Sequence, residues 1–227
     1  LIIPTLNEKN NVTNIINKIK KTKIILDILF IDDNSTDGTQ NEILELKKKF
    51  KNIYYIFREK KTGIGSAHKE GIKYCYKNDY NLIITMDCDG THDPIYLKNL
   101  ISKSKLNDYV ITSRFKKKGL IKDWPLNRKF ITYLRHYLIY IFLGINFDAS
   151  GAYRCFLTSK IKLNDILAAK NNSYAFFWEV THQLNKKGYK IYEIPVRLVY
   201  RTLGKSKMSF KHIINSFLYL LKLTLNR

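Results

Sequence analysis

The sequence predicts an α/β fold in which a mainly parallel central sheet is flanked by helices. In residues 1–113, short apolar runs alternate with stretches whose apolar residues recur at helical spacing. This alternation is typical of a parallel sheet with helices on both faces. Polar clusters follow several of the apolar runs, at the edge of the sheet where such folds bind their ligands.

The expected elements follow one another in a regular order. Apolar runs predict strands over residues 1–4, 26–31, 53–57, 82–86 and 109–113. Helical spacing, such as that of Val12, Ile15, Ile16 and Ile19, predicts helices over residues 10–21, 40–50, 66–77 and 94–102. The 227 residues contain no long linker and no internal repeat, so we expect one main domain, at residues 1–208.

Two later segments, residues 130–147 and 210–225, are rich in apolar and aromatic side chains but contain Arg, Lys and His. Each suits an amphipathic helix that lies on a membrane surface, and each equally suits a helix buried in the core. Their apolar runs are shorter than the roughly 18 residues that a transmembrane helix needs. We expect amphipathic interface helices towards the carboxyl end, with the last one at residues 209–227.

The chain is strongly basic, with 40 Lys and Arg against 19 Asp and Glu and a formal net charge of +21. This excess favours an anionic partner: nucleic acid, an anionic membrane surface or a phosphorylated substrate. A proteome biased towards Lys and Asn would account for part of it. The cysteines, at positions 75, 88 and 155, match no disulfide framework and no metal motif, which favours a reducing, cytosolic compartment.

Asp87 and Asp89 directly follow the apolar run at residues 82–86. Alternate side chains of an extended segment share a face, so both carboxylates can reach one point. Hard oxygen ligands of this kind suit Mg²⁺ or Mn²⁺, which would neutralise the charge on a departing diphosphate. The alternative is a solvated turn with a helix-capping Asp. His92, close by, could approach the metal or the phosphates, but we prefer a role in supporting this loop or capping a helix.

Asp32 and Asp33 end the second predicted strand, where an acidic residue commonly binds the ribose or base of a nucleotide. Turn capping is the alternative for both. The Gly63–Gly65 pair opens a predicted helix, and close packing of backbone on backbone is its expected role in preference to a phosphate cradle.

Basic residues gather in two stretches, residues 113–135 and 197–211. Together they suit the binding of a second phosphate-bearing group. Solvated surface is the alternative, and we prefer that or a membrane-surface role for the three lysines at 116–118.

These motifs together resemble glycosyltransferase family 2. The resemblance rests on IIPTLNE at residues 2–8, IDDNSTDGT at 31–39 and MDCDGTHDP at 86–94. Later matches, SGAYR at 150–154, WE at 178–179, EIPV at 193–196 and RTLGKSK at 201–207, look more closely like the dolichol- or polyprenol-phosphate mannose synthases. The resemblance implies a GT-A type nucleotide-binding fold and inverting transfer of a hexose, mannose from GDP-mannose, to a polyprenyl or dolichyl phosphate.

The resemblance also implies roles for individual residues. The expected nucleotide-binding residues are Pro4, Leu6, Glu8, Asp32, Asp33 and Asp87. The expected metal site, for Mg²⁺ or Mn²⁺, is Asp87, Asp89 and Thr91. The expected catalytic residues are Asp89, Arg114, Arg128, Arg201 and Lys207. The expected ligands of the acceptor phosphate are Arg114, Arg128, Thr132 and Arg201.

A phosphate acceptor is already an anion, so its attack needs positioning and charge neutralisation but no general base. The alternative within the family is transfer to a sugar hydroxyl, with Glu179 as the base. A basic nucleic-acid-binding protein is the alternative outside it, although no reader motif is present. We expect a nucleotide sugar, a polyprenyl phosphate and an anionic membrane surface as partners, no nucleic acid, and a location on the cytosolic face of a membrane.

Overall fold

The computed structural model describes residues 1–117, 120–121, 124–199, 207 and 209–225. Within these residues, one seven-stranded sheet has the strand order β3-β2-β1-β4-β6-β5-β7. Its strands are β1 (Ile2–Thr5), β2 (Ile28–Asp32), β3 (Ile53–Phe57), β4 (Leu82–Thr85), β5 (Tyr109–Ser113), β6 (Arg154–Leu157) and β7 (Ile191–Pro195). All neighbouring pairs are parallel except those of β6, which is antiparallel to both β4 and β5. The mainly parallel sheet is therefore confirmed.

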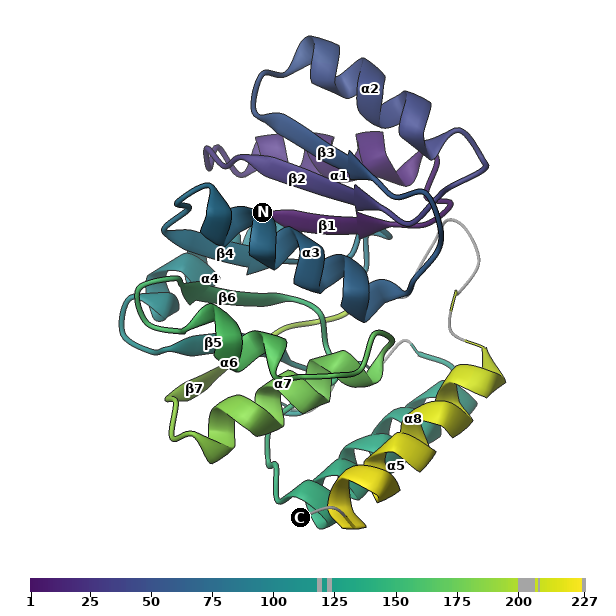
Figure 1. Ribbon diagram of the computed structural model, residues 1–227, viewed down its shortest axis with the longest axis vertical. Coiled ribbons are helices and arrows are strands. Elements are labelled where there is room, and N and C mark those ends of the chain that lie inside the picture. Colours follow the sequence, from purple (N-terminus) through teal and green to yellow (C-terminus); the bar gives the residue numbers. More distant parts are fainter. Residues whose placement is uncertain (118–119, 122–123, 200–206, 208, 226–227) are drawn as a thin grey trace.

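Helices cover both faces of the sheet (Figure 1). They are α1 (Asn11–Lys21), α2 (Thr39–Lys49), α3 (Ile64–Lys77), the short 3₁₀ helix η1 (Pro94–Tyr96), α4 (Leu97–Ser104), α5 (Leu126–Leu143), α6 (Leu163–Leu167), α7 (Ala175–Lys186) and α8 (Phe210–Leu225). Helices α1, α2 and α4 share one apolar cluster with the sheet, while α3, α6 and α7 share another. Each sheet face thus buries its side chains against helices, which is why the strands read as continuous apolar runs.

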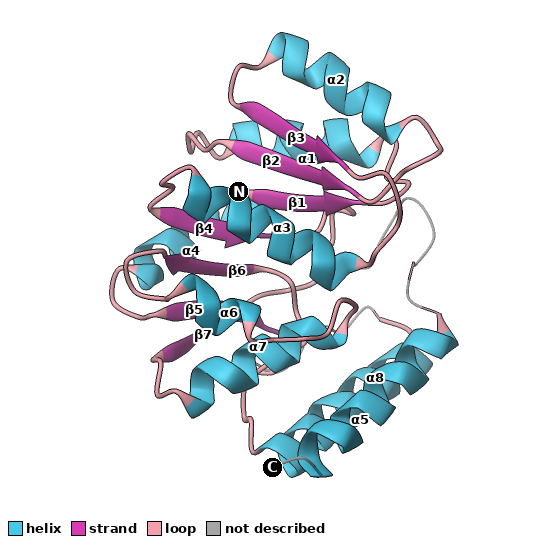
Figure 2. Ribbon diagram, in the orientation of Figure 1, coloured by secondary structure: helices cyan, strands magenta, loops and turns pink. Residues whose placement is uncertain are grey.

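The carboxyl ends of β1, β2 and β4 lie at the same edge of the sheet, as the arrowheads in Figure 2 show. The loops after these strands carry the acidic motifs of the sequence. Residue pairing keeps them level, because Thr5 of β1 lies beside Asp32 of β2. Parallel strands in register therefore bring the acidic residues of three separate segments to one edge of the sheet.

Three helices begin or end at residues other than those expected, because of the local backbone conformation. Helix α3 begins two residues early, directly after Gly63, whose φ is +102°. The helix expected over residues 94–102 is a 3₁₀ turn followed by α4. Helix α5 ends at Leu143, because Gly144 adopts the left-handed conformation, with φ of +66°, that commonly terminates helices.

Helices α5 and α8 lie side by side at one end of the molecule, and α8 also contacts α7 (Figure 1). Each presents a row of exposed apolar side chains, so neither is a buried core helix. The exposed residues are Leu126, Phe130, Ile131, Tyr133, Leu134, Tyr137, Tyr140 and Ile141 on α5, and Phe210, Ile214, Phe217, Leu218 and Leu225 on α8. Among the described residues, none of the helices combines the length and hydrophobicity needed to cross a bilayer.

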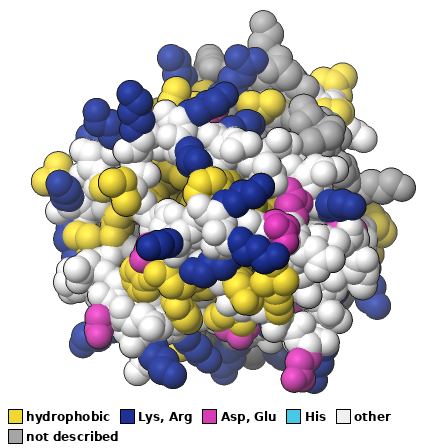
Figure 3. Space-filling model, turned by 90° about the horizontal axis from the view of Figure 1, so that it is seen from above, with side chains coloured by type: hydrophobic (Ala, Val, Ile, Leu, Met, Phe, Trp, Pro, Cys, Tyr) yellow, Lys and Arg dark blue, Asp and Glu magenta, His cyan; other side chains and the backbone are white. Residues whose placement is uncertain are grey.

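The surface carries the basic character of the sequence. On the face drawn in Figure 3, Lys and Arg side chains are spread among apolar ones, with few Asp and Glu. Positive charge is therefore spread over this face, and cationic side chains also line the pocket described next.

Candidate functional site

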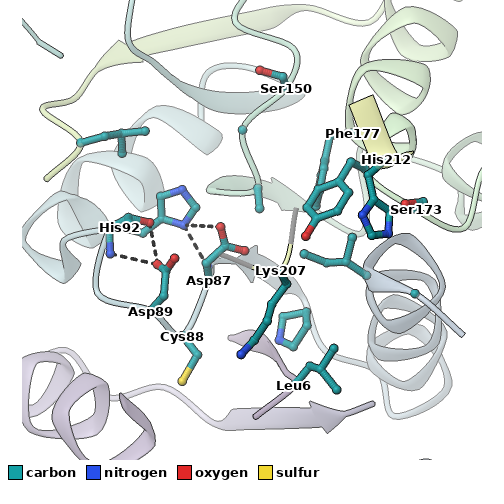
Figure 4. Close-up of a pocket in the computed structure, with 18 of the residues that line it drawn as sticks. Leu6, Asp87, Cys88, Asp89, His92, Ser150, Ser173, Phe177, Lys207 and His212 are labelled. Atoms are coloured by element: carbon teal, nitrogen blue, oxygen red, sulfur yellow. Dashed lines mark hydrogen bonds and ion pairs between the residues drawn. The ribbon is translucent and has the colours of Figure 1, made fainter. Parts of the chain in front are cut away.

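A pocket of about 410 Å³ opens at the carboxyl edge of the sheet. Its walls come from the loops after β1 and β4, from α5 and from the segment leading into α8. In Figure 4, His92 and the two aspartates of the loop after β4 lie across the pocket from Phe177 and His212. Most of the predicted site residues line this one cavity: Pro4, Leu6, Glu8, Asp33, Asp87, Asp89, Thr91, Arg114, Arg128, Thr132 and Lys207.

His92 holds the loop that carries the two aspartates. The backbone N–H of Asp87 donates to Nδ1 of His92 at 2.9 Å, and the same nitrogen lies 3.6 Å from Oδ2 of Asp87. Burial lowers the pKa of His92 to about 4, which keeps the imidazole neutral and Nδ1 free of a proton, as an acceptor must be. His92 thus positions the backbone of the loop, as expected for a supporting residue.

The two carboxylates differ in their surroundings. Oδ1 of Asp89 accepts from the backbone N–H of Thr91 at 3.0 Å and from its hydroxyl at 2.7 Å. The side chain of Asp87 is about one-third exposed, at 32%, and faces the pocket. Thr91 therefore orients Asp89, and its hydroxyl proton points to that carboxylate.

The carboxylates of Asp87 and Asp89 fit a divalent cation that is shared between the protein and a substrate. The described residues contain no cluster of three or more His, Cys, Asp or Glu side chains that could enclose a metal by themselves. Mg²⁺ and Mn²⁺ sites that also hold a substrate are commonly built from one or two carboxylates, with phosphate and water oxygens completing the shell. Asp87 and Asp89, side by side on the pocket wall, match that pattern.

The neighbouring acids at the end of β2 have separate roles. Asp33 lines the pocket, and its carboxylate accepts from Nη1 of Arg58 at 2.8 Å and from the backbone N–H groups of Thr62 and Gly63. Asp32 is completely buried and does not line the pocket. Its acceptors are taken by Thr5, Ser35 and Gln40. Asp32 therefore ties the loops after β1 and β2 together, away from the pocket lining, and its contact with a nucleotide stays a prediction.

Gly65 allows two segments of backbone to approach closely. A Cβ on this residue would lie 2.6 Å from Cβ of Phe176 and 2.8 Å from the carbonyl oxygen of Ser173. The next residue, Ser66, donates its N–H to the carbonyl of Asn172 at 3.1 Å. Close packing against the start of α7, not a phosphate cradle, is the role of this glycine.

Arg114, at the end of β5, is held by a buried carboxylate. Its Nε and backbone N–H donate to Oδ2 of Asp148 at 2.7 and 2.8 Å, and Nη2 donates to Oδ1 at 2.5 Å. Burial opposes the charged form of Asp148, but the charge and hydrogen bonds of Arg114 outweigh it and lower the pKa of Asp148. Glu193 in turn accepts from the backbone N–H of Asp148. Arg114 lines the pocket, but its charge is already paired.

Helix α5 contributes a stripe of residues to the pocket. Arg128, Ile131, Thr132 and Arg135 follow the spacing i, i+3, i+4, i+7, which places them on one helix face, and all four line the cavity. The guanidinium of Arg128 lies 4.6 Å from the ring centre of Trp124. The sequence points to Arg128 and Thr132 individually but to Arg135 only as part of the basic stretch 113–135, because no family motif marks it.

The remaining predicted residues fall in two groups. Lys207 reaches the pocket, and its Nζ donates to the carbonyl oxygen of Asn7 at 3.0 Å. Arg201 lies outside the described residues. The residues that sequence reasoning missed include Lys61, Tyr174, Phe177 and His212, which folding brings to the pocket from segments that carry no family motif.

Glu179, the candidate base for a hydroxyl acceptor, is not in the pocket. It is 1% exposed, and its carboxylate accepts from the backbone N–H groups of Lys170 and Asn171 and from the hydroxyl of Tyr219. These three hydrogen bonds fasten α7 to the preceding loop and to α8. A buried carboxylate committed in this way connects helices and does not reach a substrate.

The sequence matches the family model described as Glycosyl transferase family 2 over residues 1–162. The chain is 31% identical to the undecaprenyl-phosphate mannosyltransferase of Micrococcus luteus over 209 residues, which cover 92% of this chain and 86% of that protein. It is 29% identical to the polyprenol monophosphomannose synthase of Mycolicibacterium smegmatis over 216 residues, covering 94% and 82%.

The fold resembles solved glycosyltransferases. One is the glucosyl-3-phosphoglycerate synthase of Mycobacterium tuberculosis, determined in complex with Mn²⁺, uridine-diphosphate-glucose and glycerol 3-phosphate. It has a TM-score of 0.59 and 13% sequence identity over 96% of this chain and 78% of that one, a likeness that concerns the fold alone. The family model and the two relatives, which match along most of the chain, show that the chain belongs to glycosyltransferase family 2 and is an enzyme. Its architecture is the GT-A fold of these solved structures.

Proposed function

We propose that this enzyme transfers a hexose, mannose from GDP-mannose, to a polyprenyl phosphate with inversion at the anomeric carbon. The observation that carries the proposal is the two-sided character of α5. One side lines the pocket with Arg128, Thr132 and Arg135, while other sides of the helix expose large apolar residues. An acceptor with a phosphate head and a long apolar tail matches that arrangement, and the names of the two relatives refer to acceptors of this type.

The donor would occupy the part of the pocket formed by β1, β2 and β4. Pro4, Leu6, Glu8 and Asp33 line it and are the proposed contacts of the nucleotide. Asp87 and Asp89 would hold Mg²⁺ or Mn²⁺, which supplies charge neutralisation for the leaving diphosphate. His92 and Thr91 keep these two carboxylates in place through the hydrogen bonds described above.

The acceptor phosphate would attack directly, because an anionic oxygen needs no proton removed from it. Cationic and hydroxyl side chains, Arg128, Thr132 and Lys207, would orient it and offset the repulsion between acceptor and donor. Transfer to a sugar hydroxyl would require a base, and the hydrogen bonds of Glu179 to the backbone of Lys170 and Asn171, away from the pocket, speak against that residue as the base. The phosphate acceptor is therefore the better supported of the two.

Helices α5 and α8 would rest on the cytosolic leaflet of a membrane. Their exposed apolar residues lie near cations such as Lys211 and Lys222, a combination that suits an anionic interface. In this proposal residues 209–227 form the interface helix and residues 1–208 the catalytic domain. The arrangement would deliver a lipid phosphate to the pocket without removing its tail from the membrane.

The test is a matrix of donors and acceptors in the presence of Mg²⁺ or Mn²⁺. GDP-mannose, UDP-glucose and UDP-N-acetylglucosamine would each be offered with a short polyprenyl phosphate and with a free sugar acceptor. We expect lipid-linked mannose to be the main product. Preferred transfer from another nucleotide sugar would contradict the donor assignment, and transfer only to the free sugar would contradict the acceptor assignment.

A further inference from the structure

Arg135 is a cation in the pocket wall for which the described part of the protein provides no partner. Its side chain lines the cavity from α5, and its Nε–H is buried without a hydrogen-bond acceptor. No described residue forms an ion pair with it. A buried N–H donor without an acceptor costs free energy, and it is more costly when the group is charged. Such a residue calls for an explanation.

The surroundings of Arg135 make its charge still less favourable. The charges that act on it most are those of Arg114 and Arg128, which repel it, and that of Asp148, which attracts it. Asp148 is already paired with Arg114 through three hydrogen bonds. Burial and the Arg114 charge lower the pKa of Arg135 to about 10, although an arginine remains cationic at neutral pH. The one carboxylate that attracts Arg135 is thus already committed to Arg114.

We infer that Arg135 binds a phosphoryl group in this pocket, and that this group is the phosphate of the acceptor. A guanidinium offers five N–H donors in a plane that matches phosphate oxygens. Arg135 lies one helical turn from Thr132 and two turns from Arg128 on the same face of α5. A phosphate on this face would supply the acceptor that the buried Nε–H of Arg135 lacks.

The acceptor is favoured over the donor because of the helix on which Arg135 lies. The donor diphosphate has its own partners at Asp87 and Asp89 through the proposed cation. Helix α5 instead combines the pocket arginines with exposed apolar residues such as Phe130, Leu134 and Tyr137. A lipid phosphate could place its phosphate against the pocket arginines of α5 and its apolar tail against the exposed apolar residues. This assignment of the phosphate to the acceptor rests on the proposed function; the anion site itself does not.

The first experiment tests the anion site without any sugar transfer. Melting temperatures would be measured with and without inorganic phosphate for the wild type, for Arg135→Met and for Lys98→Met, a control that removes an exposed cation from α4, which does not line the pocket. At phosphate concentrations several times Kd, the wild type and the control should gain about 2–4 °C, and Arg135→Met should gain nothing. An equal gain in all three proteins would overturn the inference.

The melting temperature without phosphate shows whether Arg135 serves ligand binding or supports the fold. Removing an unpaired buried charge relieves repulsion from Arg114 and Arg128, so without phosphate Arg135→Met should melt no lower than the wild type. A residue that merely supports the fold would lower the melting temperature when truncated. A clear drop in the phosphate-free melting temperature of Arg135→Met would therefore overturn the inference.

The second experiment identifies which phosphate is bound. In assays with GDP-mannose and a short polyprenyl phosphate, Arg135→Met should raise KM for the lipid phosphate on the order of 10- to 100-fold. KM for the nucleotide sugar should stay within about twofold, and Arg135→Lys should recover part of the loss. A rise confined to the nucleotide sugar would assign Arg135 to the donor and overturn the acceptor assignment. Absence of transfer to any lipid phosphate by the wild type would refute the proposed function, whereas the phosphate melting result would still stand.

Discussion

At the scale of single residues, the charged groups of the pocket divide by whether the protein itself satisfies them. Asp33 and Arg114 are engaged by several partners, so they shape the pocket as much as they bind within it. Arg135 also lines the cavity, but its Nε–H is buried without a hydrogen-bond acceptor among the described residues. The sequence shows only that each of these residues is charged. The contacts in the folded protein distinguish charged groups that have partners within the protein from those that do not.

The first prediction concerns the carboxylates of the metal site. Asp89→Asn should lower transfer by about 100-fold or more, because one charged oxygen ligand of the proposed cation is lost while the shape is kept. Asp79→Asn, the same change at an exposed residue after α3, is the control and should retain full activity. Circular dichroism and the melting temperature would show that both proteins fold. Near-normal turnover of Asp89→Asn would rule out this role.

The second prediction concerns the buried pair of Arg114 and Asp148. Asp148→Asn leaves the guanidinium buried without its counter-charge, so the free energy of unfolding should fall by about 3–5 kcal/mol. Denaturant titration would measure the change. In the double variant Arg114→Met with Asp148→Asn, much of that stability should return, because the unpaired charge is gone. Additive losses from the two substitutions would show that the pair is not coupled.

At the scale of elements, helices α3 and α7 meet at a buried histidine. His68 on α3 is 1% exposed and contacts the rings of Phe176 and Phe177 on α7. Burial lowers the pKa of His68 to about 3, and the charge of Arg154 lowers it further in the same direction. The imidazole is therefore neutral in the folded protein across the ordinary pH range.

This burial predicts acid sensitivity. The unfolded chain takes up a proton near pH 6.5 while the folded protein does not, so stability is fully present above that pH and is lost as pH falls towards 3. Between pH 7 and pH 5, His68 should account for a loss of about 2 kcal/mol. Denaturant titrations at both pH values should show a correspondingly smaller loss for His68→Phe. An equal loss in wild type and variant would refute the assignment.

Helices α5 and α8 carry the membrane prediction. Replacing both Phe217 and Leu218, exposed on α8, with Glu should weaken binding to anionic liposomes by about tenfold or more, because apolar contact area is replaced by repelled charge. Ile25→Glu is the control: this residue is 94% exposed in the loop before β2, away from both helices, and should leave binding unchanged. Sedimentation with liposomes measures the difference, and equal binding by all proteins would exclude α8 from the interface.

At the scale of the whole molecule, the first half could be predicted well and the second half poorly. Residues 1–113 form strands and helices in strict alternation, so periodicity alone identifies each element. After β5 the chain inserts the antiparallel β6 between β4 and β5, and this pairing depends on contacts between residues far apart, such as Ile84 with Cys155. No local pattern encodes such a pairing.

The site shows the same contrast. Asp87 and Asp89 could be recognised because two carboxylates after a strand form a local pattern. Arg135 could not, because its role depends on which face of α5 meets the pocket and on Asp148 being paired elsewhere. Asp32 and Asp33, adjacent in sequence, separate into a buried connector and a pocket residue for the same reason.

The central proposal is that the acceptor is a phosphate, whose anionic oxygen attacks the anomeric carbon without help from a general base. The most direct measurement compares a short polyprenyl phosphate with the corresponding polyprenol, which lacks only the phosphate, under GDP-mannose and Mn²⁺ or Mg²⁺. Mannose transfer to the polyprenyl phosphate should proceed with kcat/KM at least about 100-fold higher than transfer to the polyprenol, because the alcohol offers the pocket cations no anion to bind. Equal transfer to both lipids, or transfer to the alcohol alone, would contradict it.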